Sequence, residues 1–523
     1  MKTIRRIVTG VVLFCWGTLN GIAAVSDGLP LWTNRYHGPE PNDNDPIALA
    51  VDRSGSVVVT GYSPGAAGGN DFATIKYSGA GIPLWTNRYS APYNYDDYAT
   101  GVAIDANENV FVTGHSQYYV GGGFKYFYAT VAYSSVGEPL WTNLYADTGN
   151  SLALAIALDK SGNVFVTGEA SNHIGGFNYA TVAYSGVGKP LWTNWYNGPG
   201  NSLDYANAIA VDANGNVFVT GHSVDVSPSD VVGFATVAYS GAGVPLWTNR
   251  FRAPEDFAES KPVAIAVDNR GKVFVTGYSG FPTSTNFYYD YVTLAYTING
   301  IPLWTNRFDG PANANDRARA LVVDTSGTVL VTGISIGTHG YQDYATIAYS
   351  GAGELLWTNR LNSPYAADAQ TMAITADPRG NAFVTGKAVT TVNGVGYYGY
   401  YTVALSSAGV PLWTNSYNGP VSPYYSEPTA IAVDGDGNVF VTGSSRNPYN
   451  PVHTDYATIK YSAIGPPPLA IRAIYQNVVL RWTNASFHLQ TSPVLDSAFT
   501  NIPGATSPYT NSVANSQQYF RLQ

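Results

Sequence analysis

The sequence lacks several features that mark common functional classes. It contains one cysteine, Cys15, and two methionines among 523 residues. A single cysteine excludes a disulfide framework within the chain. Charged residues make up only 12% of the sequence and the net charge is −9, so the basic footprint that nucleic-acid binding requires is absent. No segment shows a sustained 3.6-residue apolar period with helix caps, which argues against helices.

The first 24 residues have the composition of a secretory signal peptide. Three basic residues precede a mostly apolar run over residues 7–16, and Ala23 and Ala24 offer a cleavage site. A membrane anchor is the alternative, but the run is short for a span and polar residues interrupt it. Cleavage would leave a chain with a net charge of −12 and no cysteine. We therefore expect a secreted or cell-surface protein without a membrane span after cleavage.

One unit of about 50 residues recurs eight times. The glycine of its VTG motif and the tryptophan of its LWTN motif mark each copy. These landmarks are Gly61, Gly114, Gly168, Gly221, Gly277, Gly333, Gly386 and Gly443, and Trp32, Trp85, Trp141, Trp192, Trp247, Trp304, Trp357 and Trp413. Successive tryptophans are 51 to 57 residues apart. A fixed period of this size indicates a solenoid, a propeller or an array.

Each unit contains four β-type segments, best seen over residues 205–251. Segments of the types AIAVD and VFVTG are short apolar runs, YATVAYS alternates, and PLWTNRF is rich in large and β-branched residues. Turn signals separate them, D-x-x-G-N in the first half and S-G-A-G-x-P in the second. Four short strands per repeat are typical of a propeller blade, and they predict an all-β fold.

The order of the motifs predicts how the ring closes. The first PLWTNRY, over residues 30–36, precedes every AIAVD-type segment, and the last unit ends with YATIKYS and has no LWTN after it. We therefore predict eight four-stranded blades, with Trp32 in the same sheet as Tyr456; a seven-bladed ring is the alternative. The expected domains are a signal peptide (1–24), the propeller (25–465) and, after three prolines, a small C-terminal β-module (466–523).

The quoted repeat, with its VFVTG and AYSxxGxPLW motifs, resembles the SBBP-type bacterial β-propeller repeat family over roughly residues 30 to 465. The resemblance implies a propeller and says little about activity, and the family name presumes seven blades. The C-terminal segment, with VVLRW, LQTSPVL and FRL, is similar to small β-modules appended to many secreted bacterial proteins. This similarity implies a role in sorting, attachment or capping, and it is equally compatible with an ordinary accessory domain.

Aromatic residues gather in the variable loops after VTG and after WTN, which we expect on one face of the ring. Binding residues commonly lie on variable loops held by a rigid scaffold, and tyrosine combines apolar area with a hydroxyl group. Packing of the loops onto the blades is the alternative role. The candidate ligand-binding residues are Tyr93, Tyr95, Tyr118, Tyr119, Phe287, Tyr288, Tyr289, Tyr397, Tyr398, Tyr424 and Tyr425.

Acidic residues recur just before the innermost strand of seven units. They are Asp45, Asp97, Asp204, Glu259, Asp316, Asp368 and Glu427. As a ring at the mouth of a central channel they could hold Ca²⁺ or a basic peptide end. Capping of the turn that enters each strand is the alternative, and their recurrence in nearly every unit favours it. Ca²⁺ binding by the protein would support a cation site if it is lost when Asp97, Asp204 and Asp316 are all changed to Asn.

A second acidic series, beginning with Asp52 and Asp105, opens each D-x-x-G turn and is expected to be structural. No catalytic or metal motif is found. The seven histidines are scattered, no G-x-S-x-G elbow is present, and no repeat carries a unique cluster of histidine, carboxylate and nucleophile. The S-x-D-x-G-x-T-W repeat of sialidases is missing. The repeat resembles quinoprotein docking motifs, but it is one residue shorter and has Ser240 where an aspartate is expected.

These observations favour a secreted, non-enzymatic propeller that binds a polysaccharide or a cell-surface protein through its variable loop face. An exported polysaccharide hydrolase or lyase is one alternative, and a structural surface protein is another. We expect no cofactor other than Ca²⁺, no nucleic-acid partner and a monomeric state.

Overall fold

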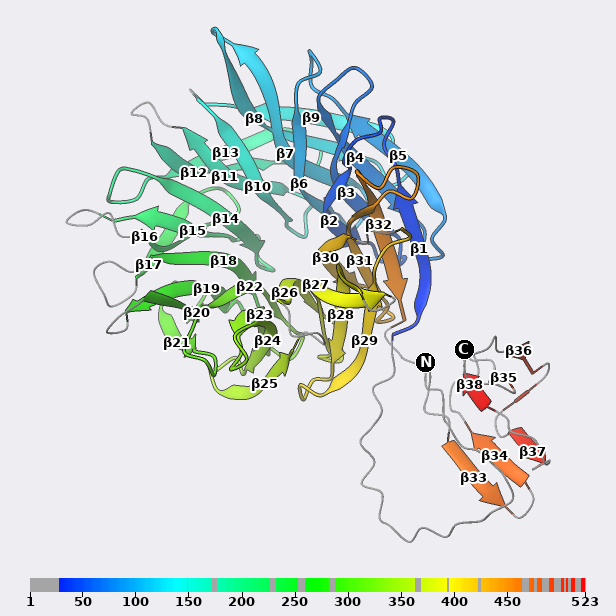
Figure 1. The fold of residues 1–523 in the computed structure, drawn as a ribbon. Coiled ribbons are helices and arrows are strands. Elements are labelled where there is room, and N and C mark those ends of the chain that lie inside the picture. Colours follow the sequence, from blue (N-terminus) through cyan, green and yellow to red (C-terminus); the bar gives the residue numbers. More distant parts are fainter. Residues whose placement is uncertain are drawn as a thin grey trace.

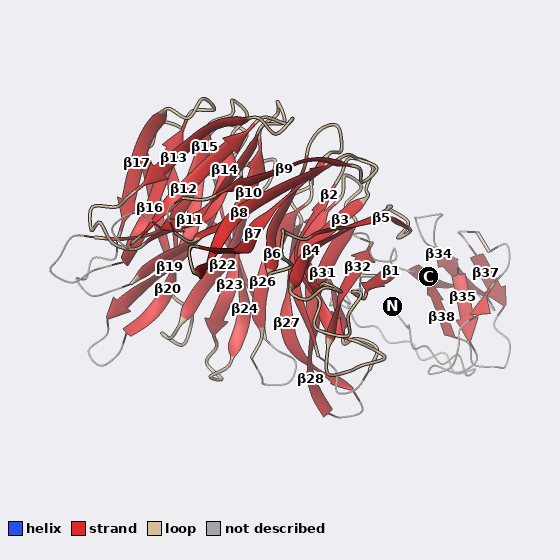
Figure 2. Cartoon of the chain, turned by 90° about the horizontal axis from the view of Figure 1, so that it is seen from above, coloured by secondary structure: helices blue, strands red, loops and turns tan. Residues whose placement is uncertain are grey.

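The computed structural model describes residues 28–147, 149–171, 176–225, 232–252, 259–282, 287–362, 368–392, 395–421 and 425–462, and short stretches between 470 and 522. The described residues form strands and turns without a helix (Figure 2). None of them therefore belongs to a helix long and apolar enough to cross a membrane. The expected signal peptide lies outside the described residues.

Eight four-stranded antiparallel sheets form a ring, with the first strand of each sheet innermost (Figure 1). Blade 1 consists of β2 (Asp45–Val51), β3 (Val57–Pro64), β4 (Asn70–Tyr77) and β5 (Pro83–Tyr89); blade 2 of β6 (Asp97–Ile104), β7 (Val110–Val120), β8 (Gly123–Tyr133) and β9 (Pro139–Tyr145); blade 3 of β10 (Ser151–Leu158), β11 (Val164–Ser171), β12 (Phe177–Tyr184) and β13 (Pro190–Tyr196); blade 4 of β14 (Asp204–Val211), β15 (Val217–Val224), β16 (Val232–Tyr239) and β17 (Pro245–Phe251). Blade 5 consists of β18 (Ser260–Val267), β19 (Val273–Pro282), β20 (Phe287–Tyr296) and β21 (Pro302–Phe308); blade 6 of β22 (Asp316–Val323), β23 (Val329–Ile336), β24 (Gln342–Tyr349) and β25 (Leu355–Leu361); blade 7 of β26 (Gln370–Ala376), β27 (Ala382–Val392), β28 (Val395–Leu405) and β29 (Pro411–Tyr417); blade 8 of β30 (Ser426–Val433), β31 (Val439–Arg446), β32 (Thr454–Tyr461) and β1 (Pro30–Tyr36).

Blade 8 is completed by the N-terminal strand. Strand β1 pairs antiparallel with β32, so that Trp32 lies opposite Lys460 and Tyr36 lies opposite Tyr456. The predicted eight-bladed ring and its closure by the first LWTN segment are confirmed, and the seven-bladed alternative is wrong. The junction between blade 8 and blade 1, where the two ends of the ring meet, is called the seam below.

Short strands account for the described part of the C-terminal segment. β33 (Ala470–Ile474), β34 (Asn477–Arg481) and β37 (Tyr509–Ser512) form one sheet. β36 (Thr500–Asn501), β35 (Leu489–Ser492) and β38 (Tyr519–Leu522) form another. These strands agree in kind with the β-type segments expected there.

The core of the protein lies between the blades. Val217 and Val219 of β15 are fully buried and pack against Phe165 and Tyr179 of blade 3. Phe218 points to the opposite face and packs with blade 5. Because both faces of every blade are covered, the second strand is apolar at successive positions instead of alternating. This explains the VFV run in the repeat.

A tryptophan and an asparagine of each LWTN segment join neighbouring blades. Trp192 Nε1 donates to the carbonyl of Gly241 at 2.9 Å, and Asn194 Nδ2 donates to the carbonyl of Gly243 at 2.7 Å. The equivalent asparagine bond is present at all eight junctions; its donors are Asn34, Asn87, Asn143, Asn194, Asn249, Asn306, Asn359 and Asn415. At the last junction Asn415 reaches Gly28, ahead of β1, and Trp413 is almost fully buried there.

At seven of the eight junctions the acceptor glycine is required for two reasons. Gly243 has a φ of +80°, and a Cβ on it would lie 2.6 Å from the Trp192 ring. Gly122, at the tip of the β7–β8 hairpin, has a φ of +86° but no atom near its Cβ position. The two glycines therefore share the backbone requirement and differ in the contact with a neighbouring blade.

Alanine at these two glycines should separate the two effects. Gly122→Ala should cost about 1 kcal/mol, because it only places a side chain in the left-handed region. Gly243→Ala should cost about 2–4 kcal/mol, because overpacking against Trp192 adds to the same strain. Thermal unfolding followed by circular dichroism measures both. If the two variants lost the same amount in melting temperature, the close contact between Trp192 and Gly243 would contribute nothing to the cost of the substitution.

Candidate functional site

The aspartates of the D-x-x-G turns accept hydrogen bonds from the turns that they open. Asp212 Oδ1 accepts hydrogen bonds from the backbone amides of Asn214 and Asn216, each at 2.8 Å, and its Oδ2 accepts one from Asn216 Nδ2. Asp159, Asp377 and Asp434 make the same set of bonds. This end of the blades is structural, as the sequence indicates.

Three acids of the expected ring are buried within the blades and do not line a mouth. Asp97, Asp204 and Asp316 have no exposed surface. Each accepts a hydrogen bond of 2.7 Å from a backbone amide six residues earlier, at Ala91, Gly198 and Gly310 respectively. They therefore hold the loop that follows WTNRY against the inner strand. Burial raises the pKa of Asp97 to about 6, although hydrogen bonds from Ser116 and Ala91 oppose the shift.

The other four acids occupy two different positions, so the seven acids do not form a single ring. Asp45 and Glu427 are one residue further along the inner strand than the buried aspartates. Glu259 and Asp368 lie before the strands; Glu259 pairs with Lys261 at 2.6 Å, and Asp368 accepts from the amide of Gln342 at 3.0 Å. Binding of Ca²⁺ by these acids remains a prediction.

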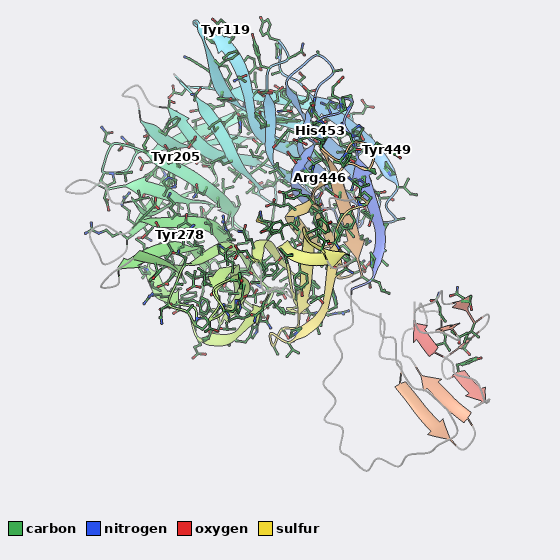
Figure 3. The ribbon with its side chains drawn as sticks, viewed as in Figure 1. Tyr119, Tyr205, Tyr278, Arg446, Tyr449 and His453 are labelled. Atoms are coloured by element: carbon green, nitrogen blue, oxygen red, sulfur yellow. The ribbon has the colours of Figure 1, made fainter. Side chains whose placement is uncertain are left out.

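The blades differ most at one cross-strand pair. A residue at or next to the start of the inner strand lies opposite the residue that follows VTG, at the same end of every blade. From blade 1 to blade 8 these rim pairs are Asp45–Tyr62, Tyr98–His115, Leu152–Glu169, Tyr205–His222, Lys261–Tyr278, Arg317–Ile334, Gln370–Lys387 and Glu427–Ser444. Figure 3 labels Tyr205 and Tyr278 on separate blades. Acids occur in blades 8, 1 and 3, and cations in blades 5, 6 and 7.

Sequence reasoning missed most of the rim pairs. A usable signal was present, because they are the variable positions inside an otherwise uniform repeat. A position that differs among most repeats has no single shared structural role and is free to serve binding.

A cleft of about 510 Å³ lies at the seam and extends to blade 2. Its lining includes Asp43, Asp45, Tyr62, Asp96, Tyr98 and His453. A second hollow of about 350 Å³ continues over blade 8, and it shares Asp43, Asp45 and Tyr62 with the first and adds Tyr425, Glu427 and Ser444. We call the two together the seam cleft. Figure 3 labels His453 and Arg446 in this part of the ring.

Hydrogen bonds fix the polar side chains of the seam cleft. Asp45 accepts from the Tyr62 hydroxyl at 3.0 Å and from Ser444 Oγ at 2.5 Å. The Tyr62 and Tyr98 rings meet edge to face, with centroids 4.9 Å apart. Burial raises the pKa of Tyr62 far above its ordinary value, and the Asp45 carboxylate adds to the shift. The site therefore presents neutral tyrosine rings beside fixed carboxylates.

The blade 8 side of the cleft is similarly ordered. The Tyr425 hydroxyl donates to Glu427 Oε2 at 2.6 Å, and Lys387 Nζ pairs with Glu427 Oε1 at 2.9 Å. Burial, followed by the hydrogen bond to Glu427, raises the pKa of Tyr425 to about 12.

The predicted aromatic residues fall into separate groups. Tyr95 meets Phe124 edge to face at 5.1 Å, Tyr119 meets Phe124 at 5.4 Å, and Tyr93 beside them is 78% exposed. Tyr118 instead stacks on Phe127 at 4.8 Å. Loop packing and exposure thus both occur within this group.

The remaining aromatic candidates lie on other blades. Tyr288 and Tyr289 belong to blade 5, and Tyr397 and Tyr398 belong to blade 7. The backbone of Tyr398 forms an isolated parallel β-bridge with that of Tyr425. The side chain of Phe287 and residue Tyr424 lie outside the described part of the structure. Of the aromatic candidates whose side chains the structure describes, only Tyr425 lines the seam cleft.

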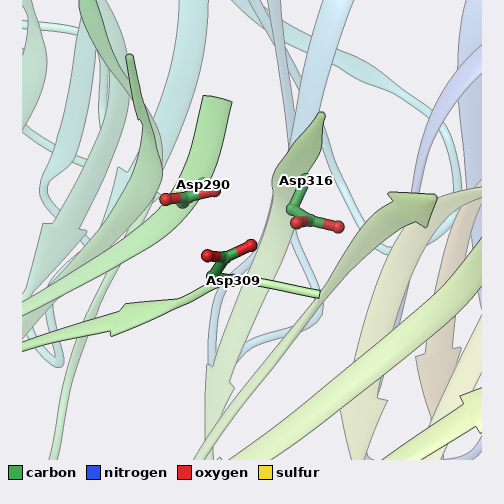
Figure 4. A group of neighbouring side chains, drawn as sticks. All are labelled: Asp290, Asp309 and Asp316. Carbon is green, nitrogen blue, oxygen red and sulfur yellow. The ribbon is translucent and has the colours of Figure 1, made fainter. Parts of the chain in front are cut away.

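In a cluster of three carboxylates in blades 5 and 6, two of the carboxylates pair with one arginine. Ligand oxygens of Asp290, Asp309 and Asp316 lie within 4.8 Å of one another (Figure 4). The Arg307 guanidinium pairs with Asp290 and Asp309. Burial raises the pKa of Asp290 to about 7, against the effect of Arg307. The same arginine position pairs with an aspartate in blades 1 and 6, as Arg88–Asp71 and Arg360–Asp343, so the cluster is a structural ion pair.

Burial also shifts the pKa values of one carboxyl and two imidazoles in the rim pairs. Burial raises the pKa of Glu169 to about 7. It lowers the pKa of His115 and of His222 to about 4, so both imidazoles are neutral at pH 7. The two imidazoles therefore offer no positive charge. Their rings instead pack against Tyr98 and Tyr205 respectively.

Comparisons with known proteins agree with the fold. The family model of the SBBP β-propeller repeat matches residues 192–223 and 421–450. These two segments carry the SBBP repeat pattern. It is 22% identical over 512 residues to an uncharacterized WD repeat-containing protein, L264, of Acanthamoeba polyphaga mimivirus, which aligns with 89% of this chain; the chain spans about a third (34%) of that protein's length.

Two solved structures are similar at a low level. A polysaccharide lyase, Uly1, has a TM-score of 0.41 and 13% identity, covering 82% of this chain and 91% of its own. A puromycin hydrolase has a TM-score of 0.42 and 13% identity, covering 81% of this chain and 62% of its own. Likenesses of this size carry no argument about activity.

Glu169→Gln should stabilise the protein in a pH-dependent way. The folded state raises the pKa of this carboxyl, so it favours the protonated form and loses stability as the pH rises through about 7. Gln copies the protonated form; the variant should therefore melt at a higher temperature than the parent at pH 8 and at the same temperature at pH 4. Glu138→Gln, in an exposed turn, should match the parent at both pH values. A Glu169→Gln variant that melts like the parent at pH 8 would contradict the burial cost.

Proposed function

We propose that this protein is an exported binding propeller whose ligand is a polysaccharide, held in the seam cleft. The observation that carries the proposal is the lining of that cleft, in which carboxylates and tyrosines are fixed side by side on blades 8, 1 and 2. The composition of the N-terminal 24 residues supports export.

The chemistry of the cleft suits a ligand rich in hydroxyl groups. Carboxylate oxygens such as those of Asp43 and Asp96 accept hydrogen bonds from sugar hydroxyls. The apolar faces of Tyr62 and Tyr98 pack against the C–H face of a sugar ring while their hydroxyls add polar contacts. The lining of the larger hollow contains no lysine or arginine, so an anionic unit would be repelled there.

The cleft is built for binding more than for catalysis. Asp45, at its centre, already accepts hydrogen bonds from Tyr62 and Ser444, so a reacting group would have to displace them. A hydrolase or lyase and a purely structural surface protein are the alternatives, and a single assay separates all three.

A paired substitution at the rim tests the site. Tyr98→Ala should weaken polysaccharide binding by about tenfold, because loss of one aromatic contact is worth about 1.4 kcal/mol. Tyr205→Ala removes the same side chain at the same position of blade 4 and should leave binding unchanged. Residues 25–523 would be screened against neutral polysaccharides, and bound fraction and released sugar would be recorded together.

Each other result of this assay would overturn part of the proposal. Released sugar would show an enzyme. Equal loss in the two variants would place the ligand outside the seam cleft. No binding to any polysaccharide by the parent would favour a protein partner or a structural role.

A further inference from the structure

Blade 6 has an inner strand unlike the others. Strand β22 carries two arginines, Arg317 in the rim pair and Arg319 two residues later, and Arg319 is exposed. Arg319 lies at the irregularity in the register between Ala318 and Ala320, which every inner strand shares. The residues at the Arg319 position of the other blades are uncharged: Ile47, Thr100, Leu154, Asn207, Val263, Met372 and Thr429.

Two tyrosine rings of blade 5 hold the Arg317 side chain. Its guanidinium carbon lies 4.5 Å from the centroid of Tyr289 and 5.3 Å from that of Tyr278. The two rings meet at an angle of 89°, with centroids 5.3 Å apart. Cation–π contact fixes the guanidinium without using its N–H groups, and Arg317 Nε has no hydrogen-bond partner among the described residues.

The charge of these two arginines is not neutralised by the described part of the chain. No described carboxylate forms a salt bridge with Arg317 or Arg319, whereas Arg88 and Arg360, in the outer strands, pair with aspartates. The nearby Glu259 is paired with Lys261 at 2.6 Å, and it also accepts from Tyr289 at 3.2 Å. Arg317 Nε is itself buried, so an external anion would meet the outer part of the Arg317 guanidinium and the exposed Arg319.

We infer that Arg317 and Arg319 form a second binding site, which takes the carboxylate or sulfate of an acidic sugar unit. The planar fork of arginine matches these oxyanions in geometry and charge. Tyr278 and Tyr289 orient Arg317 and supply aromatic surface beside it. This inference rests on the proposed polysaccharide function, and it adds that the ligand carries acidic as well as neutral units.

A charge-matched pair of double variants tests this site by calorimetry. A short oligogalacturonate should bind the parent more tightly than maltotetraose of the same length, although the net charge of −9 opposes it. The variant R317Q/R319Q should lose at least tenfold in affinity for the oligogalacturonate and keep its affinity for maltotetraose. R270Q/R379Q removes two exposed turn arginines and should bind like the parent.

Two further measurements define which anion the site takes and how it binds that anion. Competition by inorganic sulfate would show that the site takes either oxyanion, and its failure would restrict the site to carboxylates. R317K/R319K, which keeps the charge without the fork, should recover only part of the affinity. An equal loss in both glutamine variants, or no preference for the acidic oligosaccharide, would overturn the site while leaving neutral binding at the seam intact. Absence of binding to either oligosaccharide would overturn the proposed function as well.

Discussion

The ring depends on the contact between the LWTN segment of one blade and a turn of the next blade, which it packs against and hydrogen-bonds. The indole of Trp192 covers Gly243, and its nitrogen and Asn194 satisfy two turn carbonyls. These bonds lie at the junctions between blades, where a chain without disulfides needs a constraint other than covalent cross-links. For blade 7 the equivalent bond runs from Asn415 to Gly28, just ahead of β1. The first strand is therefore held both by pairing within blade 8 and by this bond from blade 7.

This contact lets the opposite end of the blades vary. The tight D-x-x-G turns, the tryptophan–asparagine contacts and the buried aspartates together fix backbone positions, and these features repeat. The rim pairs lie outside that repeated framework and differ among most blades. The proposed binding role places recognition at this variable end, apart from the framework that holds the ring.

Charge is distributed unevenly among the rim residues. Asp45 and Glu427 lie in neighbouring blades at the seam, and Arg317 and Arg319 lie in blade 6. The acidic side is rich in hydrogen-bonded tyrosine, and on the basic side Arg317 packs against two tyrosine rings. The two proposed sites would thus serve neutral and anionic units of a ligand.

The sequence by itself determined the number of blades, the order of strands and the closure by Trp32, because these follow from repeat spacing and from which motif comes first. It also located the turn aspartates, whose hydrogen bonds are local. Only the tertiary structure decided which acids are accessible. Asp97 is buried while Asp45, one register position further along its strand, lines the seam cleft, because a shift of one residue turns a side chain to the other face of the strand. The tertiary structure also placed Arg317 against two tyrosine rings of another blade, a contact that no local pattern encodes.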